Sequence, residues 1–386
     1  MAPFARQRCA NFTKCLGKPQ LKGSIMSKPN YDEQTRQLLQ KHYKSYPCLQ
    51  PQDVFKFLFQ SALGCEHLVA SYDTALEYIK REQLSANVNA IPLVERLDGH
   101  YSRVYLSCLK DGLSAQTLAK LFCLSAKKED DGHHLLQQKL RVATSLVEEG
   151  LIPLSKQDFH QKLNAWQQMG CPAIHHSDVF RQEYRPAYRV IDNKYANFLS
   201  VFCQIDKQLA SGPVVVAIEG GSASGKSTLA NVIAEVYDCN VVHMDDFFLR
   251  PEQRTPERLA QIGGNVDYER FAEQVIVPLG QAKTLSFCPF DCTKQALVDQ
   301  VTLPHKQLTI VEGVYSLHPR FGNYQTLAVF LQISTSLQKN RIAVRNSPAL
   351  AQRFFDQWIP MENRYFDGAR VQSRCNIIID VDKLQN

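Results

Sequence analysis

The sequence predicts an α/β fold in which a parallel sheet is flanked by helices, preceded by a mainly α-helical domain. Two observations carry this prediction. After about residue 213, short apolar runs alternate with helix-like stretches, in "PVVVAIEG", "NVVHMDDF", "LTIVEGVY", "LAVFLQIS" and "CNIIID". Continuous apolar runs are typical of strands buried on both faces, and this alternation is typical of a parallel sheet. From about residue 32 to 195, apolar residues instead recur at helical spacings.

Length and composition indicate a two-domain protein. The chain has 386 residues, which is enough for two domains that each bury a core. A hydrophobic content of 44% and a charged content of 21% are typical of a soluble globular protein. No uncharged apolar run approaches the roughly 18 residues of a membrane span, so we expect no membrane partner. We expect a basic, disordered leader over residues 1–30, a helical domain of unknown role over 31–195, and a second domain over 196–386.

The positive charge of the chain lies in the leader. The net charge is +6, and six basic residues occur before residue 32 with no acidic residue among them: Arg6, Arg8, Lys14, Lys18, Lys22 and Lys28. The remaining 38 basic residues balance 38 acidic ones. A neutral folded body attracts a phosphate backbone only weakly at long range, so we expect no nucleic-acid partner. The leader is a transit peptide, a disordered extension, or an upstream addition to a chain that starts at Met26.

The 12 cysteines indicate a reducing compartment. They are scattered along the chain without a C-x-x-C pair, and no signal peptide with an apolar core precedes them. This distribution disfavours zinc fingers and a secreted disulfide framework. Cys288 and Cys292 are four residues apart, but no second ligand pair accompanies them. We therefore expect reduced thiols in a cytoplasmic protein.

Helix signals recur through the first domain. Val54, Phe57, Leu58, Leu63 and Leu68 recur at three-to-five-residue spacings, as on a buried helix face, and Ser114 suits the N-cap of the helix in "AQTLAKLFCLSA". The segment "PAIHHSDVFRQEYRPAYRVI" concentrates histidines and arginines just before the second domain. It is either an anion-binding surface that faces the active site or an interdomain packing segment with solvated arginines.

A glycine-rich loop follows the first apolar run of the second domain. Residues 219–228 read E-G-G-S-A-S-G-K-S-T and match the pattern G-x-x-x-x-G-K-[ST] between a strand and a helix. In this loop the backbone amides and the N-terminus of the next helix bind phosphates. We expect Lys226 to neutralise the β- and γ-phosphates of ATP and Ser227 to join a Mg²⁺ shell. The expected nucleotide-binding residues are Gly220, Gly221, Ser222, Ala223, Ser224, Gly225, Lys226, Ser227 and Thr228.

Acidic residues end two further apolar runs. "VVHMDDFFLR" reaches Asp245 and Asp246, and "LTIVEGVY" reaches Glu312. A carboxylate at such a strand end accepts a proton from an acceptor hydroxyl or holds a metal ion. We expect Asp245 to be the catalytic base and a metal contact, Asp246 a substrate contact, and Glu312 a second metal ligand.

The segments "GGSASGKST", "MDDFF" and "IVEG" together resemble the uridine kinase, phosphoribulokinase and pantothenate kinase group of P-loop small-molecule kinases. The resemblance covers about residues 213–380 and implies a P-loop kinase domain, ATP, Mg²⁺ and a small-molecule hydroxyl acceptor. It implies that Asp245 is the general base and that Glu312 lies beside the metal and the sugar. "GGNVDYERF" resembles the segment whose aspartate contacts the sugar hydroxyls, which nominates Asp267.

The base-reading segment of uridine kinases resembles "FCPFDCTKQAL", which nominates Phe290 and Asp291 as substrate contacts. Phe290 stands where those kinases have a tyrosine, and their nearby histidine is absent from this segment. A uracil-reading pocket loses polar partners by these changes. The acceptor therefore stays open among nucleosides, pantothenate-like molecules and sugar-like molecules.

Two arginines follow the fourth apolar run, where such kinases carry a mobile lid. Arg341 and Arg345 are four residues apart and hence on one helix face. We expect both to be catalytic residues that close over the γ-phosphoryl group, because guanidinium groups stabilise its spread charge. The alternative is a solvated helix face.

Two functions follow from these residues. The leading hypothesis is an ATP- and Mg²⁺-dependent kinase that transfers the γ-phosphoryl group to a hydroxyl of a small molecule. The alternative is a nucleotide-dependent ATPase or switch whose helical domain binds a protein partner. Asp245, Asp267 and the two lid arginines favour the kinase, because a switch needs no acceptor site. The sequence leaves open whether the protein forms a homo-oligomer.

Overall fold

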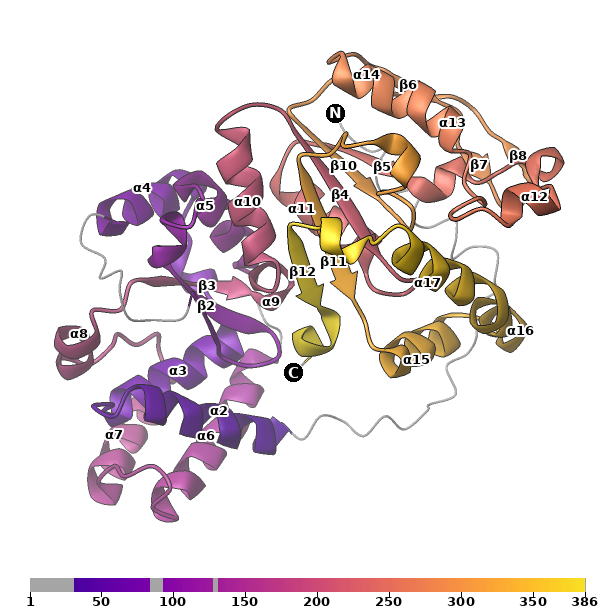
Figure 1. The fold of residues 1–386 in the computed structure, drawn as a ribbon. Helices are drawn as coiled ribbons and strands as arrows, with labels where there is room; N and C mark the ends of the chain where they lie inside the picture. Colours follow the sequence, from indigo (N-terminus) through magenta and orange to yellow (C-terminus); the bar gives the residue numbers. More distant parts are fainter. Residues whose placement is uncertain (1–30, 84–92, 128–130, 386) are drawn as a thin grey trace.

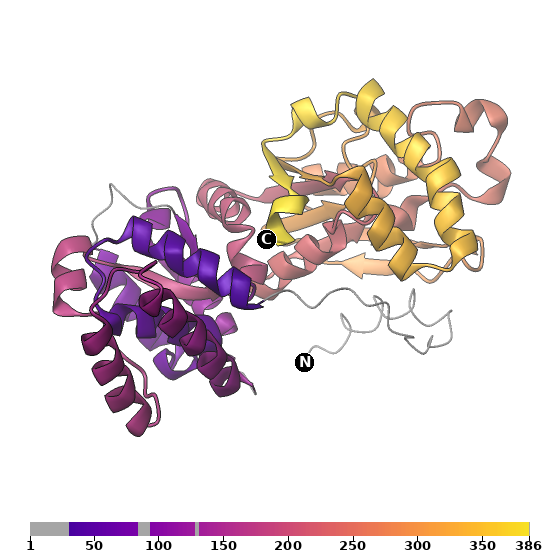
Figure 2. The same cartoon turned by 90° about the horizontal axis from the view of Figure 1, so that it is seen from below.

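The structure, a computed structural model, describes residues 31–83, 93–127 and 131–385 (Figure 1). The predicted leader lies outside these residues. A mainly helical N-terminal half and an α/β C-terminal half lie side by side in both views (Figure 1, Figure 2). Within the described ranges, no helix combines the length and apolar character that crossing a membrane requires.

A five-stranded parallel sheet confirms the α/β prediction, and its strand order is β12-β11-β4-β10-β5. The three central strands are buried along almost their whole length because helices cover both faces. The order places β4, which leads into the glycine-rich loop, between β10 and β11. The five strands coincide with the predicted apolar runs: β4 (Val214–Gly220), β5 (Asn240–His243), β10 (Leu308–Glu312), β11 (Leu327–Gln332) and β12 (Ile377–Asp380).

Side chains alternate between the two faces of this sheet. Val216 and Ile218 point into one buried cluster, and Ala217 between them points into another. This alternation follows from the two-residue period of a strand. Helices α10 (Leu199–Leu209) and α11 (Lys226–Val236) pack on the first face. Helices α13 (Tyr268–Phe271) and α17 (Ile359–Gly368) pack on the second.

Two helices of the C-terminal half contain a wide π-helical turn. These turns, Ala272–Ile276 and Phe354–Trp358, each end two residues before a proline, Pro278 or Pro360. Proline lacks the N–H that an α-helical turn needs, which accounts for the local change of pitch. The remaining elements of this half are α12 (Pro256–Leu259), α14 (Val277–Gly280), α15 (Thr335–Arg345), α16 (Pro348–Arg353), β6 (Leu285–Phe287) paired with β9 (Val301–Leu303), and β7 (Phe290–Asp291) paired with β8 (Ala296–Leu297).

The N-terminal half is mainly helical, as predicted, but it also contains an antiparallel sheet of three short strands. Every residue of the middle strand is buried, polar residues Ser102 and Arg103 included, so this strand shows no polar–apolar alternation. The elements are α2 (Tyr31–Ser45), α3 (Pro51–Leu63), α4 (Tyr72–Gln83), β1 (Val94–Arg96), β2 (Tyr101–Tyr105), α5 (Ala115–Ser125), α6 (Gly132–Glu148), α7 (Lys156–Gln168), α8 (Asp178–Tyr184), β3 (Tyr188–Asp192) and α9 (Asn193–Ala196).

The helix signals in this half were mostly correct. Ser114 is the N-cap of α5, and its hydroxyl accepts a hydrogen bond from the Thr117 amide at 3.0 Å. Val54 and Leu58 are buried on α3. Leu68 is 50% exposed, so its assignment to the same apolar face was wrong. The reason is that α3 ends at Leu63 and Leu68 lies on a separate turn.

One histidine and one arginine of the segment before the second half pack inside the N-terminal half, and the other three are exposed. His176 contacts the Asp53 carboxylate (Nδ1 to Oδ1, 2.9 Å) and the Tyr188 hydroxyl (Nε2 to Oη, 2.7 Å). Arg189 donates to Glu82 at 2.7 Å. These contacts favour the packing interpretation of the segment over an anion-binding surface.

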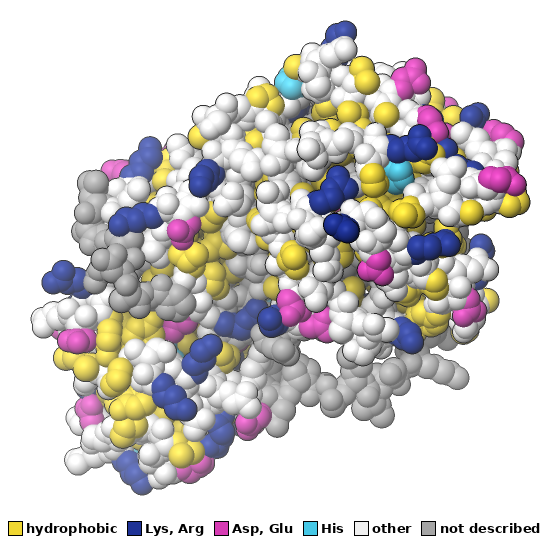
Figure 3. Space-filling view, in the orientation of Figure 1, with side chains coloured by type: hydrophobic (Ala, Val, Ile, Leu, Met, Phe, Trp, Pro, Cys, Tyr) yellow, Lys and Arg dark blue, Asp and Glu magenta, His cyan; other side chains and the backbone are white. Residues whose placement is uncertain are grey.

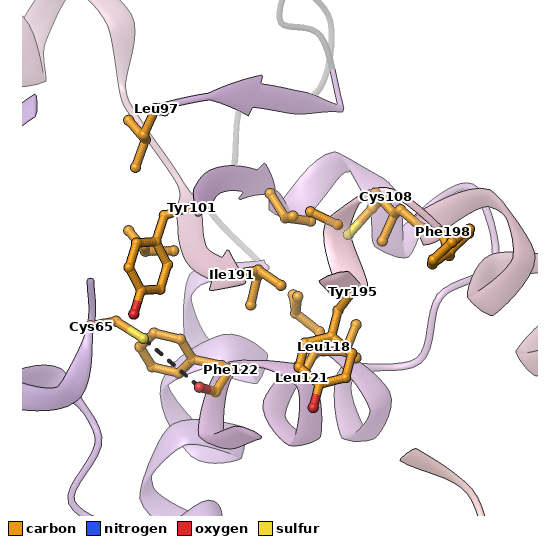
Figure 4. Packing of buried hydrophobic residues seen from close by; sticks show 14 of the residues in the cluster. Cys65, Leu97, Tyr101, Cys108, Leu118, Leu121, Phe122, Ile191, Tyr195 and Phe198 are labelled. Carbon is orange, nitrogen blue, oxygen red and sulfur yellow. Dashed lines mark hydrogen bonds between the residues drawn. The ribbon is translucent and has the colours of Figure 1, made fainter. Parts of the chain in front are cut away.

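One buried apolar cluster runs through both halves. It joins Leu58 and Leu118 of the helical half to Phe202 of α10 and to Val216 and Ile310 of the parallel sheet. Figure 4 shows the part of this cluster around Tyr101, Leu118, Ile191 and Phe198. Buried contacts cross the predicted domain boundary at residues 195 and 196. The boundary stays a prediction.

Polar contacts join the same halves behind the P-loop helix. The Tyr195 hydroxyl donates to Glu235 at the end of α11 (2.5 Å), and the Ser114 amide of the helical half donates to Asp206 of α10 (2.7 Å). On the face drawn in Figure 3, basic and acidic side chains are interspersed over both halves. Each cysteine that the structure describes is a free thiol.

Candidate active site

The glycine-rich loop connects β4 to α11 at the carboxyl edge of the sheet. Gly220 has φ +142°, and a Cβ added there would lie 2.6 Å from the Leu331 carbonyl oxygen on β11. Only glycine therefore fits this position without a shift of the backbone. Lys226 folds back over the loop, and its Nζ donates to the carbonyls of Gly220 (2.9 Å) and Gly221 (3.1 Å).

The loop residues differ in their exposure. Ser227 and Thr228, in the first turn of α11, are exposed, and Ser222, Ala223 and Gly225 are half-buried. Ser224 is 2% exposed, and its hydroxyl finds no hydrogen-bond partner in the part of the chain that the structure describes. The amides and hydroxyls at this helix N-terminus form a surface suited to an anion.

Strand register brings the predicted acidic residue of β10 to the loop. Glu312 pairs with Ile218 of β4 on one side and with His243 of β5 on the other. The Ser227 hydroxyl donates to Glu312 Oε1 at 2.9 Å, and His243 Nδ1 lies 2.6 Å from the same oxygen. The contact follows from the topology, because parallel strands end at one edge of a sheet.

Glu312 and His243 shift each other's ionisation. Burial opposes the charged form of Glu312, but the hydrogen bond and charge of His243, with Lys226 and Ser227, outweigh it and lower its pKa. Burial likewise opposes the charged form of His243, and the hydrogen bond and charge of Glu312 raise its pKa above the ordinary value. The pair is therefore favoured as carboxylate and imidazolium.

Asp245 lies on the turn after β5, beside this pair. Asp245 is exposed to solvent, and many protein atoms lie close around its carboxylate. That enclosure and the charge of Glu312 raise its pKa to about 6, against the opposing charges of Lys226 and His243. Asp245 thus lies within electrostatic range of both predicted metal and phosphate contacts.

The oxygen atoms of Ser227, Asp245 and Glu312 suit a hard cation such as Mg²⁺. In the described ranges, no group of three or more His, Cys, Asp or Glu side chains is arranged to hold a metal ion without help. Mg²⁺ is typically held by one or two carboxylates together with substrate phosphates and waters. The residue types at this edge fit that mode of binding.

The predicted acceptor contacts separate into two groups. Asp246 is half-buried on the same turn as Asp245, and its carbonyl accepts from Arg270 at 2.7 Å. Asp267 is 3% exposed; it caps α13 and contacts Gln253 and Arg270. A substrate hydroxyl would have to displace these partners to reach it.

The second group lies on β7. Phe290 is buried, and the Arg254 guanidinium carbon lies 5.5 Å from its ring centroid. Asp291 accepts from the amides of Thr293 (2.7 Å) and Lys294 (3.1 Å), which lower its pKa. Asp291 is thus engaged within its own hairpin, whereas Phe290 contacts Arg254 outside it. Direct contact of Phe290 and Asp291 with a substrate stays a prediction.

The two predicted lid arginines have different surroundings. Arg341 of α15 donates from Nη1 to the carbonyl oxygen of Ala223 at 3.0 Å, which places it on the glycine-rich loop. Arg345 is exposed, and its guanidinium carbon lies 5.9 Å from the ring centroid of Phe354. The structure therefore brings Arg341, but not Arg345, into direct contact with the glycine-rich loop.

Comparison with solved structures finds partial likenesses. A possible uridine kinase from Bacillus stearothermophilus has a TM-score of 0.35 and 20% identity, over 46% of this chain and 97% of that one. A proposed fructose transport system kinase from Silicibacter sp. TM1040 has a TM-score of 0.32 and 20% identity, over 43% of this chain and 89% of that one. No model of a known protein family matches the chain. Function therefore has to be inferred from the side chains of the site.

Two charged residues of the site did not emerge from the sequence. His243 contacts Glu312, and its position two residues before Asp245 at a strand end was the available signal. Glu219 is fully buried one residue before the loop, and its signal was a carboxyl group inside an apolar run. Neither residue belongs to the loop pattern itself, so the pattern does not predict them.

Proposed function

We propose that the chain is an ATP- and Mg²⁺-dependent kinase that transfers the γ-phosphoryl group to a hydroxyl of a small molecule. One observation carries this proposal. The phosphate-binding loop and the acidic residues Asp245 and Glu312 meet at one edge of the parallel sheet, joined by the 2.9 Å contact between Ser227 and Glu312. A site that only binds a nucleotide does not require a carboxylate such as Asp245, whose pKa is raised, beside Glu312. Phosphoryl transfer to a hydroxyl uses such a carboxylate as a base.

In this proposal the chain's residues divide the reaction between them. Lys226 and the loop amides bind the triphosphate, and Ser227, Asp245 and Glu312 would hold Mg²⁺, which neutralises charge on the phosphates when bound. The acceptor oxygen forms a bond to the γ-phosphorus, the bond from that phosphorus to the bridging oxygen breaks, and ADP leaves. Asp245 accepts the proton of the acceptor hydroxyl. Arg341 and Arg345 stabilise charge on the phosphoryl group.

The test is a transfer assay with γ-labelled ATP and Mg²⁺ across nucleosides, vitamins and sugars, using the full-length protein. We expect the native protein to label at least one acceptor and Lys226→Ala to label none. We expect Asp245→Asn to reduce transfer by about 10²–10⁴-fold, the usual contribution of a general base. Unfolding midpoints should match those of the native protein. Full transfer by Asp245→Asn would remove that residue from the base role.

The alternative proposal is a nucleotide-dependent switch whose helical half binds a protein partner. It is supported by the contact of Tyr195 and Lys194 with Glu235, which joins the P-loop helix α11 to the helical half. A movement of α11 on nucleotide binding would pass through these contacts. If no acceptor in the assay becomes labelled and the protein hydrolyses ATP slowly, the switch is favoured over the kinase.

A further inference from the structure

Two consecutive residues of the glycine-rich loop are held by side chains from helices α15 and α17. Ser222 donates its amide to Glu362 Oε2 at 2.9 Å and its hydroxyl to Glu362 Oε1. The Ser222 carbonyl accepts from Gln338 Nε2 at 2.9 Å, and the Ala223 carbonyl accepts from Arg341 Nη1 at 3.0 Å. The backbone polar groups of Ser222 are thus fixed on both sides.

The loop conformation at this point is one that the backbone disfavours. Ala223 has φ +61°, in the left-handed region that residues other than glycine rarely adopt. A residue persists in this region only when its surroundings hold it there. Hydrogen bonds to the Ser222 and Ala223 carbonyls from Gln338 and Arg341 supply that hold.

Glycine at position 221 leaves space beside the loop for the side chain of Gln338. A Cβ at Gly221 would lie 2.8 Å from Gln338 Nε2, so glycine at this position allows the close approach of Gln338. The same Cβ would be in ordinary contact with Glu362 Oε2, at 3.6 Å. Glu362 is 5% exposed and Gln338 is 7% exposed. A carboxylate is the side chain that can accept both the amide and the hydroxyl of one serine.

We propose that Glu362 and Gln338 are positioning residues that hold Ser222, and the peptide unit that joins it to Ala223, in the shape the loop needs to bind phosphate. Neither is assigned a contact with a phosphate. They act through the peptide units of Ser222 and Ala223, which precede the amides at the N-terminus of α11. The purpose of this positioning, nucleotide binding, rests on the proposed function. The contacts of Glu362 and Gln338 with Ser222 are present without nucleotide.

A hydrogen-exchange measurement on the ligand-free, full-length protein tests whether Glu362 stabilises the loop conformation. Glu362→Gln keeps the size of the side chain but replaces one carboxylate oxygen with an amide NH2, which cannot accept a hydrogen bond from the Ser222 amide or hydroxyl. We expect amides of residues 220–226 to exchange about tenfold faster in this variant, because local opening costs less. The control is Asp367→Asn, which removes an exposed carboxylate from the same helix and should leave exchange unchanged.

A titration with MgADP tests the consequence for binding. We expect Glu362→Gln to weaken MgADP binding about tenfold, as losses of supporting contacts around a site commonly do. In an Ala223→Gly background the same change should cost less, because glycine adopts a positive φ without support. A purely structural role for Glu362 would give equal losses in both backgrounds.

The outcomes separate this proposal from the proposed function. Unchanged exchange and unchanged MgADP affinity in Glu362→Gln would overturn the positioning role, and so would equal losses in the two Ala223 backgrounds. If exchange is faster in Glu362→Gln but the native protein does not bind MgADP, the positioning role of Glu362 is supported and the proposed kinase function is contradicted.

Discussion

At the scale of single residues, Glu219 is a fully buried carboxyl group one residue before the glycine-rich loop. Its Oε1 accepts from the Leu317 amide (2.9 Å) and the Tyr365 hydroxyl (2.7 Å). Burial raises its pKa from 4.5 to about 7, although these hydrogen bonds and the charge of Lys226 oppose the shift. The folded protein therefore binds this proton more tightly than the unfolded chain does.

This shift predicts a pH-dependent stability. The stabilising contribution of the protonated group is complete below about pH 4.5 and is lost as pH rises through about 7. The total change is about 3 kcal/mol, at roughly 1.4 kcal/mol for each pKa unit. In Glu219→Gln the side chain is neutral at every pH. We expect its free energy of unfolding, from urea titrations between about pH 4 and 8, to fall by about 3 kcal/mol less than that of the native protein.

Asp367→Asn is the matched control for this measurement, because its carboxylate is exposed. Its stability profile should run parallel to that of the native protein. A Glu219→Gln profile that also runs parallel would show that Glu219 does not titrate in this range.

At the scale of elements, the strand–loop–helix unit of β4 and α11 depends on glycine at position 220. Gly220→Ala would place a methyl group 2.6 Å from the Leu331 carbonyl, at a φ that favours glycine. We expect a loss of about 1–3 kcal/mol in the free energy of unfolding, from strain and overpacking. Urea unfolding measures the loss.

Gly280→Ala is the control for this substitution. Gly280 ends α14, and a Cβ there meets nothing within 4 Å. Its stability should stay the same or rise slightly, because alanine favours helix. Equal effects of the two substitutions would mean that the close approach of β11 to the loop does not restrict residue 220.

At the scale of the whole molecule, the shared apolar cluster predicts that both halves unfold together. The chain has 2 tryptophans, and Trp166 is buried on α7 of the helical half. In Trp358→Phe, fluorescence therefore reports this half while far-UV circular dichroism reports the whole chain. We expect the two denaturation curves to coincide, because a buried core that crosses the boundary couples the halves. A fluorescence transition at lower denaturant would indicate a separately folding helical domain.

Much of the α/β half is encoded in consecutive residues. Five apolar runs and the loop pattern predicted β4, β5, β10, β11 and β12 because a buried strand and a phosphate loop each have a local signature. The meeting of Ser227 with Glu312 also followed, since parallel strands end at one edge. The antiparallel sheet of the helical half did not follow, because its strands are short and its middle strand is buried throughout, without a polar–apolar alternation.

The composition and order of residues thus specified the parallel sheet, its phosphate loop and the acidic ends of its strands. The tertiary structure alone showed that Glu362 binds Ser222, 140 residues away, that Arg341 contacts Ala223, and that one core crosses both halves. These contacts depend on which face of a distant helix meets the loop. A periodic pattern defines such a face but does not state what it packs against.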